Sequence, residues 1–133
     1  QLEVGSQATP FEHRSFGEEL LLCKRYYHQL EYDGAEKVVA IGMNIDTSSS
    51  VTVYHYPIEM RSAPSVSTPS VSGGYRMRSA DDNNTHTTFP NLELISTDGM
   101  QIASNAHSSL TAGQGVTCRL AADGAKVKFD AEL

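Results

Sequence analysis

Hydrophobic and polar residues follow a helical pattern near the start of the chain and then alternate along most of its length. Ser15 and Glu18 have the S-x-x-E spacing of a capping box, in which each side chain accepts a hydrogen bond from the other residue's backbone N–H. Acidic residues in the first turn and basic residues in the last turn complement the helix dipole. The pattern predicts a short α-helix capped by Ser15, and we expect Leu20–Leu22 to pack on the sheet or on a neighbouring subunit.

From Tyr26 onward the apolar positions recur every second residue, which is typical of β-strands. The first such strand ends at Tyr32, and a hairpin is predicted over residues 37–56 with a polar turn at 46–50. The first strand of this hairpin has two alternating sets of side chains, and we expect it to be well buried. One set is Val39, Ile41, Met43 and Ile45, and the other is Val38, Ala40, Gly42 and Asn44.

Turn signals continue through the rest of the chain. Prolines at 57, 64 and 69 cannot donate to a ladder, so we expect edge strands or connections there. Asp98-Gly99 and Asp123-Gly124 are turn dipeptides, and they predict two more hairpins, over residues 92–106 and 116–133. Many short strands separated by turns predict a mostly β fold, an antiparallel, jelly-roll-like β-sandwich with one short N-terminal α-helix.

Length and composition are those of one globular domain. The chain has 133 residues, of which 39% are hydrophobic and 20% charged, and this balance separates it from disordered sequences. Residues 1–13 are largely polar and contain Pro10, so we interpret them as a linker or as the tail of a preceding domain. Residues 14–133 are predicted to form the C-terminal β-sandwich domain.

The charge balance argues against two classes of partner. There are 10 basic and 16 acidic residues, which give a formal net charge of -6. Nucleic-acid binding needs a basic face that displaces counterions from phosphates, and electrostatic attachment to anionic membranes needs one as well. No apolar run approaches the ~20 residues of a membrane-spanning helix. We therefore expect neither nucleic-acid binding nor membrane insertion.

The sequence offers little catalytic or metal-binding chemistry. The five histidines have no zinc-ligand spacing with another histidine or a cysteine, and no G-x-S-x-G elbow occurs. We predict no catalytic residue, no metal site and no cofactor, and hence no enzyme. Cys23 and Cys118 are interpreted as two buried thiols, although a disulfide between them stays open.

The most polar loop of the chain follows an aromatic residue and two arginines. Asp and Asn side chains offer the donors and acceptors that sugar hydroxyls require, and tyrosine offers a stacking face. Oxygen ligands at 81–84 also suit calcium, but their spacing is not that of an EF-hand loop, and an ordinary solvated turn is favoured. The tyrosines at 26, 32, 54 and 56 are expected in the core or between subunits. The predicted glycan site comprises Tyr75, Arg76, Arg78, Asp81, Asp82, Asn83, Asn84 and His86.

Four stretches of the chain together resemble a known family. They are QLEVGSQATPFEHRSFGEELLLCKRYYHQL at the start, PIEMRSAPSVS in the middle, LTAGQG near the end and the terminal FDAEL. In this order they resemble the C-terminal domains of tailed-bacteriophage virion proteins, which are tail fibres or minor structural proteins. The match spans both ends of the chain, but it carries no motif for a catalytic or receptor-binding site.

The resemblance implies a homotrimer, because phage fibres and their tips are usually three-fold. It also implies a place in the virion, contact with other virion proteins, and assembly in the cytoplasm of a bacterial host, where thiols stay reduced. The first functional hypothesis is a knob that recognises a host surface glycan or another receptor during adsorption. The alternative is a purely structural module for trimerisation or for capsid or tail decoration. A polysaccharide-degrading enzyme is the least favoured hypothesis.

Overall fold

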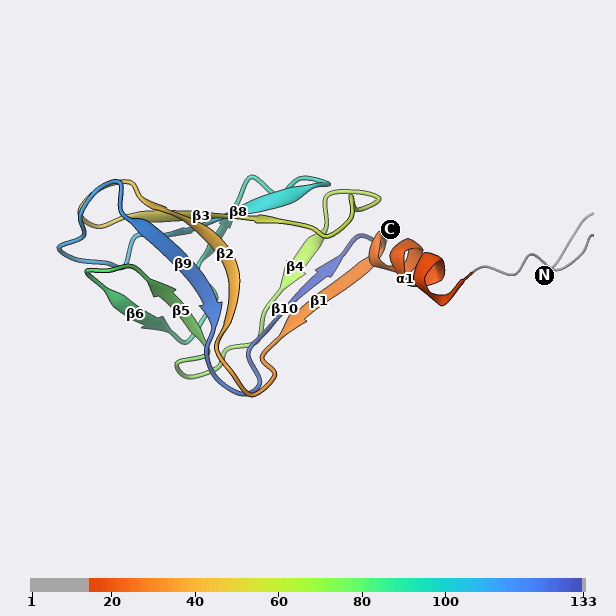
Figure 1. Ribbon diagram of the computed structural model, residues 1–133, viewed down its shortest axis with the longest axis horizontal. Helices are drawn as coiled ribbons and strands as arrows, with labels where there is room; N and C mark the ends of the chain where they lie inside the picture. Colours follow the sequence, from red (N-terminus) through yellow and green to blue (C-terminus); the bar gives the residue numbers. More distant parts are fainter. Residues whose placement is uncertain (1–14, 133) are drawn as a thin grey trace, which may run out of the picture.

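The computed structural model describes residues 15–132, which form one α-helix and ten β-strands (Figure 1). In chain order the elements are α1 (Phe16–Lys24), β1 (Tyr27–Glu31), β2 (Lys37–Asn44), β3 (Ser50–His55), β4 (Ser65–Ser67), β5 (Tyr75–Arg78), β6 (Asn83–His86), β7 (Asn91–Glu93), β8 (Gly99–Ser104), β9 (Gly115–Leu120) and β10 (Lys126–Asp130).

These strands form two sheets. A three-stranded sheet has the order β1-β10-β4, and a seven-stranded sheet has the order β6-β5-β9-β2-β3-β8-β7. Every pairing between these strands is antiparallel. The predicted fold class, mostly β with antiparallel sheets and a single short helix, is confirmed, and the two sheets are consistent with a β-sandwich.

The seven-stranded sheet curls into a half-barrel. Its two edge strands, β6 and β7, follow one another in the chain and are joined only by residues 87–90. In a flat sheet of seven strands the two edges would lie ~29 Å apart, whereas the chain from His86 to Asn91 can span at most ~18 Å. The sheet must therefore bend until its edges approach each other, which gives it a concave and a convex face (Figure 1).

The core fills the space between the concave face and the three-stranded sheet. Tyr75, Met77 and Ile102 point into it from the larger sheet, and Val127 and Phe129 point into it from β10. All five side chains are 0% exposed. Their burial is the main source of stability, because each large apolar side chain removed from water contributes about 1.5–3 kcal/mol.

An aromatic cluster joins the two sheets. The Phe129 ring stacks against His28 of β1 and Tyr54 of β3, with centroid distances of 5.5 and 5.4 Å, and Tyr56 meets it edge-on at 5.2 Å. Burial raises the pKa of Tyr54 and Tyr56 to about 12 each. The expected core position is confirmed for these two tyrosines, whereas Tyr26 is 41% exposed.

Helix α1 begins as the sequence predicts but does not pack as expected. The Ser15 side chain accepts a hydrogen bond from the Glu18 backbone N–H at 3.3 Å, and the Glu18 carboxylate accepts one from the Ser15 N–H at 2.9 Å, so the capping box is confirmed. No residue of the helix is buried, and Leu20–Leu22 do not pack on the sheet within residues 15–132. Packing on a neighbouring subunit stays a prediction.

The exposed helix also changes the interpretation of the cysteines. Cys118 in β9 is buried, as predicted, whereas Cys23 lies on the exposed helix, so the expectation of two buried thiols is wrong for Cys23. Both cysteines are free, and the disulfide that the sequence left open does not form.

Strand β2 is buried on one face only, so the expectation of a well-buried strand is wrong for the other face. Ile41, Met43 and the following Ile45 are 68%, 57% and 58% exposed, while Ala40 and Asn44 are buried. The concave face has little room here, because a Cβ on Gly42 would lie only 1.9 Å from the Val51 carbonyl oxygen. Small side chains therefore fill the inside of the curl, and the large ones lie on the convex face.

Two of the three predicted hairpins are confirmed. Strands β2 and β3 pair within residues 37–56, and β7 pairs with β8 around the turn at Gly99. The third prediction is wrong, because β9 belongs to the seven-stranded sheet while β10 pairs with β1 and β4. The turn at Asp123-Gly124 carries the chain from one sheet to the other instead of folding it back (Figure 1).

Candidate functional site

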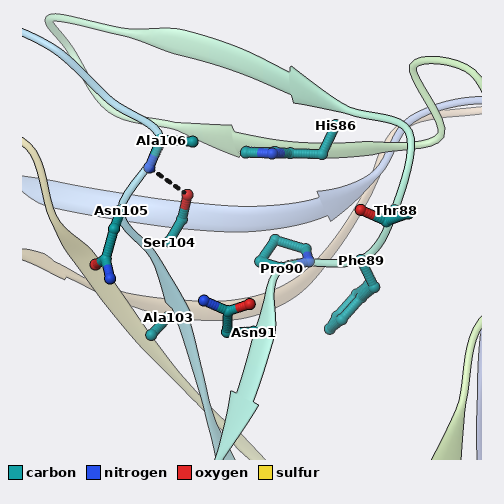
Figure 2. A pocket seen from close by; sticks show the side chains of 9 residues that line it. All are labelled: His86, Thr88, Phe89, Pro90, Asn91, Ala103, Ser104, Asn105 and Ala106. Atoms are coloured by element: carbon teal, nitrogen blue, oxygen red, sulfur yellow. Dashed lines mark hydrogen bonds between the residues drawn. The ribbon is translucent and has the colours of Figure 1, made fainter.

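A pocket of about 220 Å³ opens where the two edges of the curled sheet approach each other (Figure 2). We call it the seam pocket. His86 forms its wall at the end of β6, residues 88–91 form a second wall, and residues 103–106, which end β8 and follow it, form the third. The polar side chains that line it are His86, Thr88, Asn91, Ser104 and Asn105.

The link between β6 and β7 is held in place by its own sequence. Phe89 is 9% exposed and meets the Tyr75 ring edge-on, with centroids 5.2 Å apart and an interplanar angle of 86°. Pro90 follows it at the point where the chain enters an edge strand, and it has no N–H that would need a ladder partner. The buried ring and the fixed φ of the proline therefore position one wall of the pocket.

The pocket presents amide groups without partners inside the protein. Asn91 and Asn105 are exposed, and neither side chain makes a hydrogen bond to another residue within residues 15–132. Ser104, by contrast, is 4% exposed, and its Oγ accepts a hydrogen bond from the Ala106 N–H at 3.4 Å (Figure 2). The two amides are therefore the groups most available for directional hydrogen bonds to a ligand.

Two histidines lie together beneath the pocket wall. The His86 and His107 rings are 6.2 Å apart at an interplanar angle of 76°. The His107 Nδ1 lies 2.8 Å from the Asp82 Oδ2, and the His107 side chain is only 1% exposed. Nε2 of each ring is buried and has no hydrogen-bond partner in the described part of the chain.

The surroundings of His86 favour its neutral form. Desolvation by burial lowers the pKa of His86, the nearby His107 ring lowers it further, and the Asp82 carboxylate acts in the opposite direction. A neutral imidazole can either donate or accept a hydrogen bond at Nε2, depending on its tautomer. His86 therefore adds an adaptable polar group to the pocket wall.

Tyr75 does not have the role that the sequence suggested. It is fully buried, and its hydroxyl donates to the backbone carbonyl of Pro69 at 2.6 Å, with the Lys126 carbonyl at 3.3 Å. A ring with no exposed surface cannot stack on a sugar, so this part of the predicted site is wrong. The residue is a core aromatic that ties β5 to its neighbours.

The two arginines point away from Tyr75. Successive residues of a strand alternate between faces, so Arg76 and Arg78 lie on the convex face while Tyr75 and Met77 point inward. Arg76 bonds to the Glu36 carboxylate, which also accepts from Arg119 at 3.1 Å. The predicted combination of an aromatic ring and guanidinium groups in a single site is therefore not formed.

The acidic loop is a structural link more than an open polar surface. Asp81 accepts a hydrogen bond from the Thr111 N–H at 2.9 Å, and this bond and that from Gln114 lower the pKa of the Asp81 carboxyl. Asp82 bonds to His107 as described above, and the Asn84 amide donates to the Ala106 carbonyl. These contacts fasten residues 79–84 to residues 106–114.

The two remaining residues of the predicted site, Asn83 and His86, lie in different places. Asn83 is exposed on β6, outside the seam pocket, and only His86 lines the pocket. For the calcium alternative, no group of three His, Cys, Asp or Glu side chains suited to a metal ion occurs in residues 15–132.

Sequence patterns did not reveal the rest of the pocket. The pairing of β7 with β8 brings Thr88 and Asn91 beside Ser104 and Asn105, and the curl of the sheet brings His86 of β6 to them. Pro90 is a local signal that could have indicated an edge strand there, because a proline cannot donate to a ladder. His107 gave no signal, because its partner Asp82 lies 25 residues away in the sequence.

Comparison of the chain with protein-family models, with curated proteins and with solved structures found no match. The resemblance to phage virion proteins therefore stays a prediction, and the function has to be argued from the geometry of the site. Within residues 15–132, none of the helical structure is long and apolar enough to span a membrane.

Proposed function

We propose that this chain is the C-terminal domain of a tailed-bacteriophage fibre or minor virion protein, and that it binds a neutral glycan on the host surface through the seam pocket. The observation that carries the glycan part is the pair of amides, Asn91 and Asn105, that line a polar pocket from two neighbouring segments (Figure 2). The sequence resemblance supports the virion part.

The chemistry of the pocket suits a sugar. Each hydroxyl of a sugar both donates and accepts, and so do primary amides, hydroxyls and a neutral imidazole. The volume of about 220 Å³ lies below the roughly 300–1,000 Å³ of pockets for drug-sized ligands. This size favours one terminal sugar residue over an enclosed oligosaccharide, and the net charge of -6 favours a neutral glycan over an anionic one.

Assembly into a homotrimer makes such a small site effective. A single shallow polar pocket binds weakly, but three copies that engage one cell surface together raise the overall avidity by about 10²–10⁴. The proposed partners are therefore two further copies of the chain, other virion proteins and a host surface glycan, with the domain located in the virion.

The pocket can be tested with a pair of alanine variants. We expect Asn91→Ala combined with Asn105→Ala to abolish binding to glycan arrays and to reduce adsorption of the protein to host cells. Asn83→Ala is the matched control, because it removes an exposed strand amide outside the pocket. Circular dichroism and native mass spectrometry establish that fold and assembly are unchanged. Unaltered binding by the double variant would show that the seam pocket is not the site.

A second candidate function is supported by a different surface. Strands β2 and β3 expose large apolar side chains on the convex face, as a module that serves only for trimerisation or decoration would. That function predicts a stable oligomer that binds no glycan on the array. Release of reducing sugar ends from host polysaccharide would instead indicate the enzyme, which we do not propose.

A further inference from the structure

One row of side chains runs along the convex face across six of the seven strands. Residues that pair directly in neighbouring strands point to the same side of a sheet. The pairings Arg78↔Thr117, Thr117↔Ile41, Ile41↔Val53, Val53↔Gln101 and Gln101↔Glu93 join six strands into one row. We call this the convex row: Arg78, Thr117, Ile41, Val53, Gln101 and Glu93.

The centre of the convex row is apolar and open. Ile41 is 68% exposed and Val53 is 44% exposed, and Met43, one pleat further along β2, is 57% exposed. Val51 pairs with Met43 and adds a fourth apolar side chain to the same face. Single apolar residues are common on protein surfaces, but a contiguous exposed apolar patch of this kind marks an interaction surface.

A hollow beside the apolar centre could receive a side chain from another molecule. It has a volume of about 180 Å³ and is lined by Val53, Leu94 and Gln101 among others. Leu94 is 78% exposed and has a φ of 47°, in the left-handed region that costs a leucine backbone strain. Because most of the Leu94 side chain lies in water, its burial within residues 15–132 offsets little of this strain, whereas a neighbouring molecule would bury it.

The two ends of the convex row carry opposite charges. Arg78 is exposed and makes no ion pair within the described part of the chain, and Glu93 at the other end is bonded only to the Gln101 amide, at 2.8 Å. Between them, Thr117 and Gln101 flank the apolar centre as polar, uncharged residues. The row thus has one basic flank, an apolar centre and one acidic flank, which is complementary to another copy of itself.

From this complementarity we infer that the convex row is the surface through which copies of this chain associate, with the Arg78 flank of one copy against the Glu93 flank of the next. A convex face touches a single flat partner only along a narrow strip. Three copies around an axis instead bring the apolar centres toward the axis and the flanks of neighbouring copies together. The number of copies rests on the proposed function, whereas the surface itself does not.

The first experiment replaces the apolar centre. In the full chain, Ile41→Glu combined with Val53→Glu places charge in the proposed contact, and we expect the trimer to dissociate with an affinity loss of about 100-fold or more. Ser67→Glu, at an exposed position of edge strand β4, is the control, since it adds a glutamate to the other sheet. Analytical ultracentrifugation over a concentration series measures the assembly.

The second experiment tests the charge complementarity. Arg78→Glu and Glu93→Arg should each weaken association by about fivefold, and the double variant, in which the two charges are exchanged, should recover it. A double variant that is weaker than either single variant overturns the proposed arrangement of the flanks.

The outcomes separate this inference from the proposed function. Oligomers that persist in the Ile41→Glu, Val53→Glu variant, or a wild-type chain that is monomeric at micromolar concentration, would overturn the inference. A wild-type dimer that this variant dissociates supports the surface and removes the three-fold arrangement. The glycan array measures binding through Asn91 and Asn105 independently of assembly. A chain that binds no glycan would therefore leave the inference about the association surface intact.

Discussion

The two faces of the β2–β3 hairpin contradict the usual relation between hydrophobicity and burial. On the concave face lie small or polar residues, Asn44, Ser50 and Thr52, which are each at most 1% exposed. On the convex face lie Ile41 and Val53, which are largely exposed. The comparison teaches that an alternating pattern identifies the two faces of a strand but does not say which one the chain itself will bury.

The buried polar face is tolerated because its groups are paired. The Ser50 hydroxyl donates to the Asn44 Oδ1 at 2.8 Å, the Asn44 Nδ2 donates to the Thr111 carbonyl at 3.3 Å, and the Thr52 hydroxyl donates to the Ile102 carbonyl at 3.3 Å. Buried polar groups cost little once they are hydrogen-bonded. Small side chains also fit the inside of the curl, where Gly42 already lies against the Val51 backbone.

The largest difference in unfolding free energy should appear between two variants that replace isoleucine by alanine, one on each face. Ile102→Ala removes a fully buried side chain and should lower the free energy of unfolding by about 3 kcal/mol. Ile41→Ala should cost the monomer less than about 0.5 kcal/mol. Urea denaturation at several protein concentrations measures both, and any larger effect of Ile41→Ala should appear only where the protein is associated. Equal, concentration-independent losses would contradict the distinction between the faces.

A smaller but still substantial effect should come from adding one methyl group inside the curl. Gly42→Ala would place a Cβ 1.9 Å from the Val51 carbonyl oxygen, and overpacking of this kind costs about 2–3 kcal/mol. Gly115→Ala is the matched control on β9, opposite Met43, where a Cβ would meet nothing within 4 Å. Thermal unfolding of both variants measures the difference. If Gly42→Ala were as stable as the control, the claim that the concave face has no room for a side chain at Gly42 would be wrong.

Acid should lower the stability of the folded domain through two partly buried histidines, His28 and His86. Burial lowers the pKa of His28, with a further contribution from Lys24, and burial and His107 lower the pKa of His86. Because each folded pKa lies below the ordinary 6.5, the unfolded chain binds more protons as the pH falls. Their contribution to stability is therefore complete above pH 6.5 and declines below it. Urea unfolding across this range should show the decline, and the His28→Gln, His86→Gln double variant should show less of it.

The smallest effect on the whole domain should come from the helix cap. Ser15→Ala removes the confirmed capping hydrogen bond, which should destabilise α1 by about 1 kcal/mol. Since no residue of α1 is buried, the global unfolding free energy should change little, and the loss should appear as faster amide hydrogen exchange in α1. A global loss as large as the local one would show that the helix packs on something in the assembled protein.

Sequence patterns predicted the parts of the fold that local chemistry determines. The S-x-x-E spacing predicted the start of α1, and the turns at 46–50 and at Asp98-Gly99 predicted two hairpins. The same dipeptide signal at Asp123-Gly124 failed, because a turn does not determine whether the next strand joins the same sheet. The expectation that β2 is well buried held for one face only, since the curl of the sheet depends on all seven strands.

The candidate site was less predictable than the fold. The polar composition of residues 81–86 directed attention to the edge of the sheet where the seam pocket lies, and His86 lines that pocket. The signal could not show that Asp81, Asp82 and Asn84 would be used in contacts to residues 106–111, which lie more than twenty positions further along the chain. Nor could it show that Tyr75 would be buried by residues from other strands.

The curl of the large sheet has a consequence for solubility at high concentration. The edge of a β-sheet carries unpaired N–H and C=O groups, which can recruit a strand from another molecule and start aggregation. Here the two edges approach each other, joined by residues 87–90, and the Asn84 side chain already bonds to the Ala106 carbonyl across the gap. An incoming strand would have to displace these contacts. On the small sheet, edge strand β4 has only three residues between Pro64 and Pro69, which leaves little template for polymerisation. These three edges therefore offer little template for cross-β association, and β1 is the remaining edge of the small sheet.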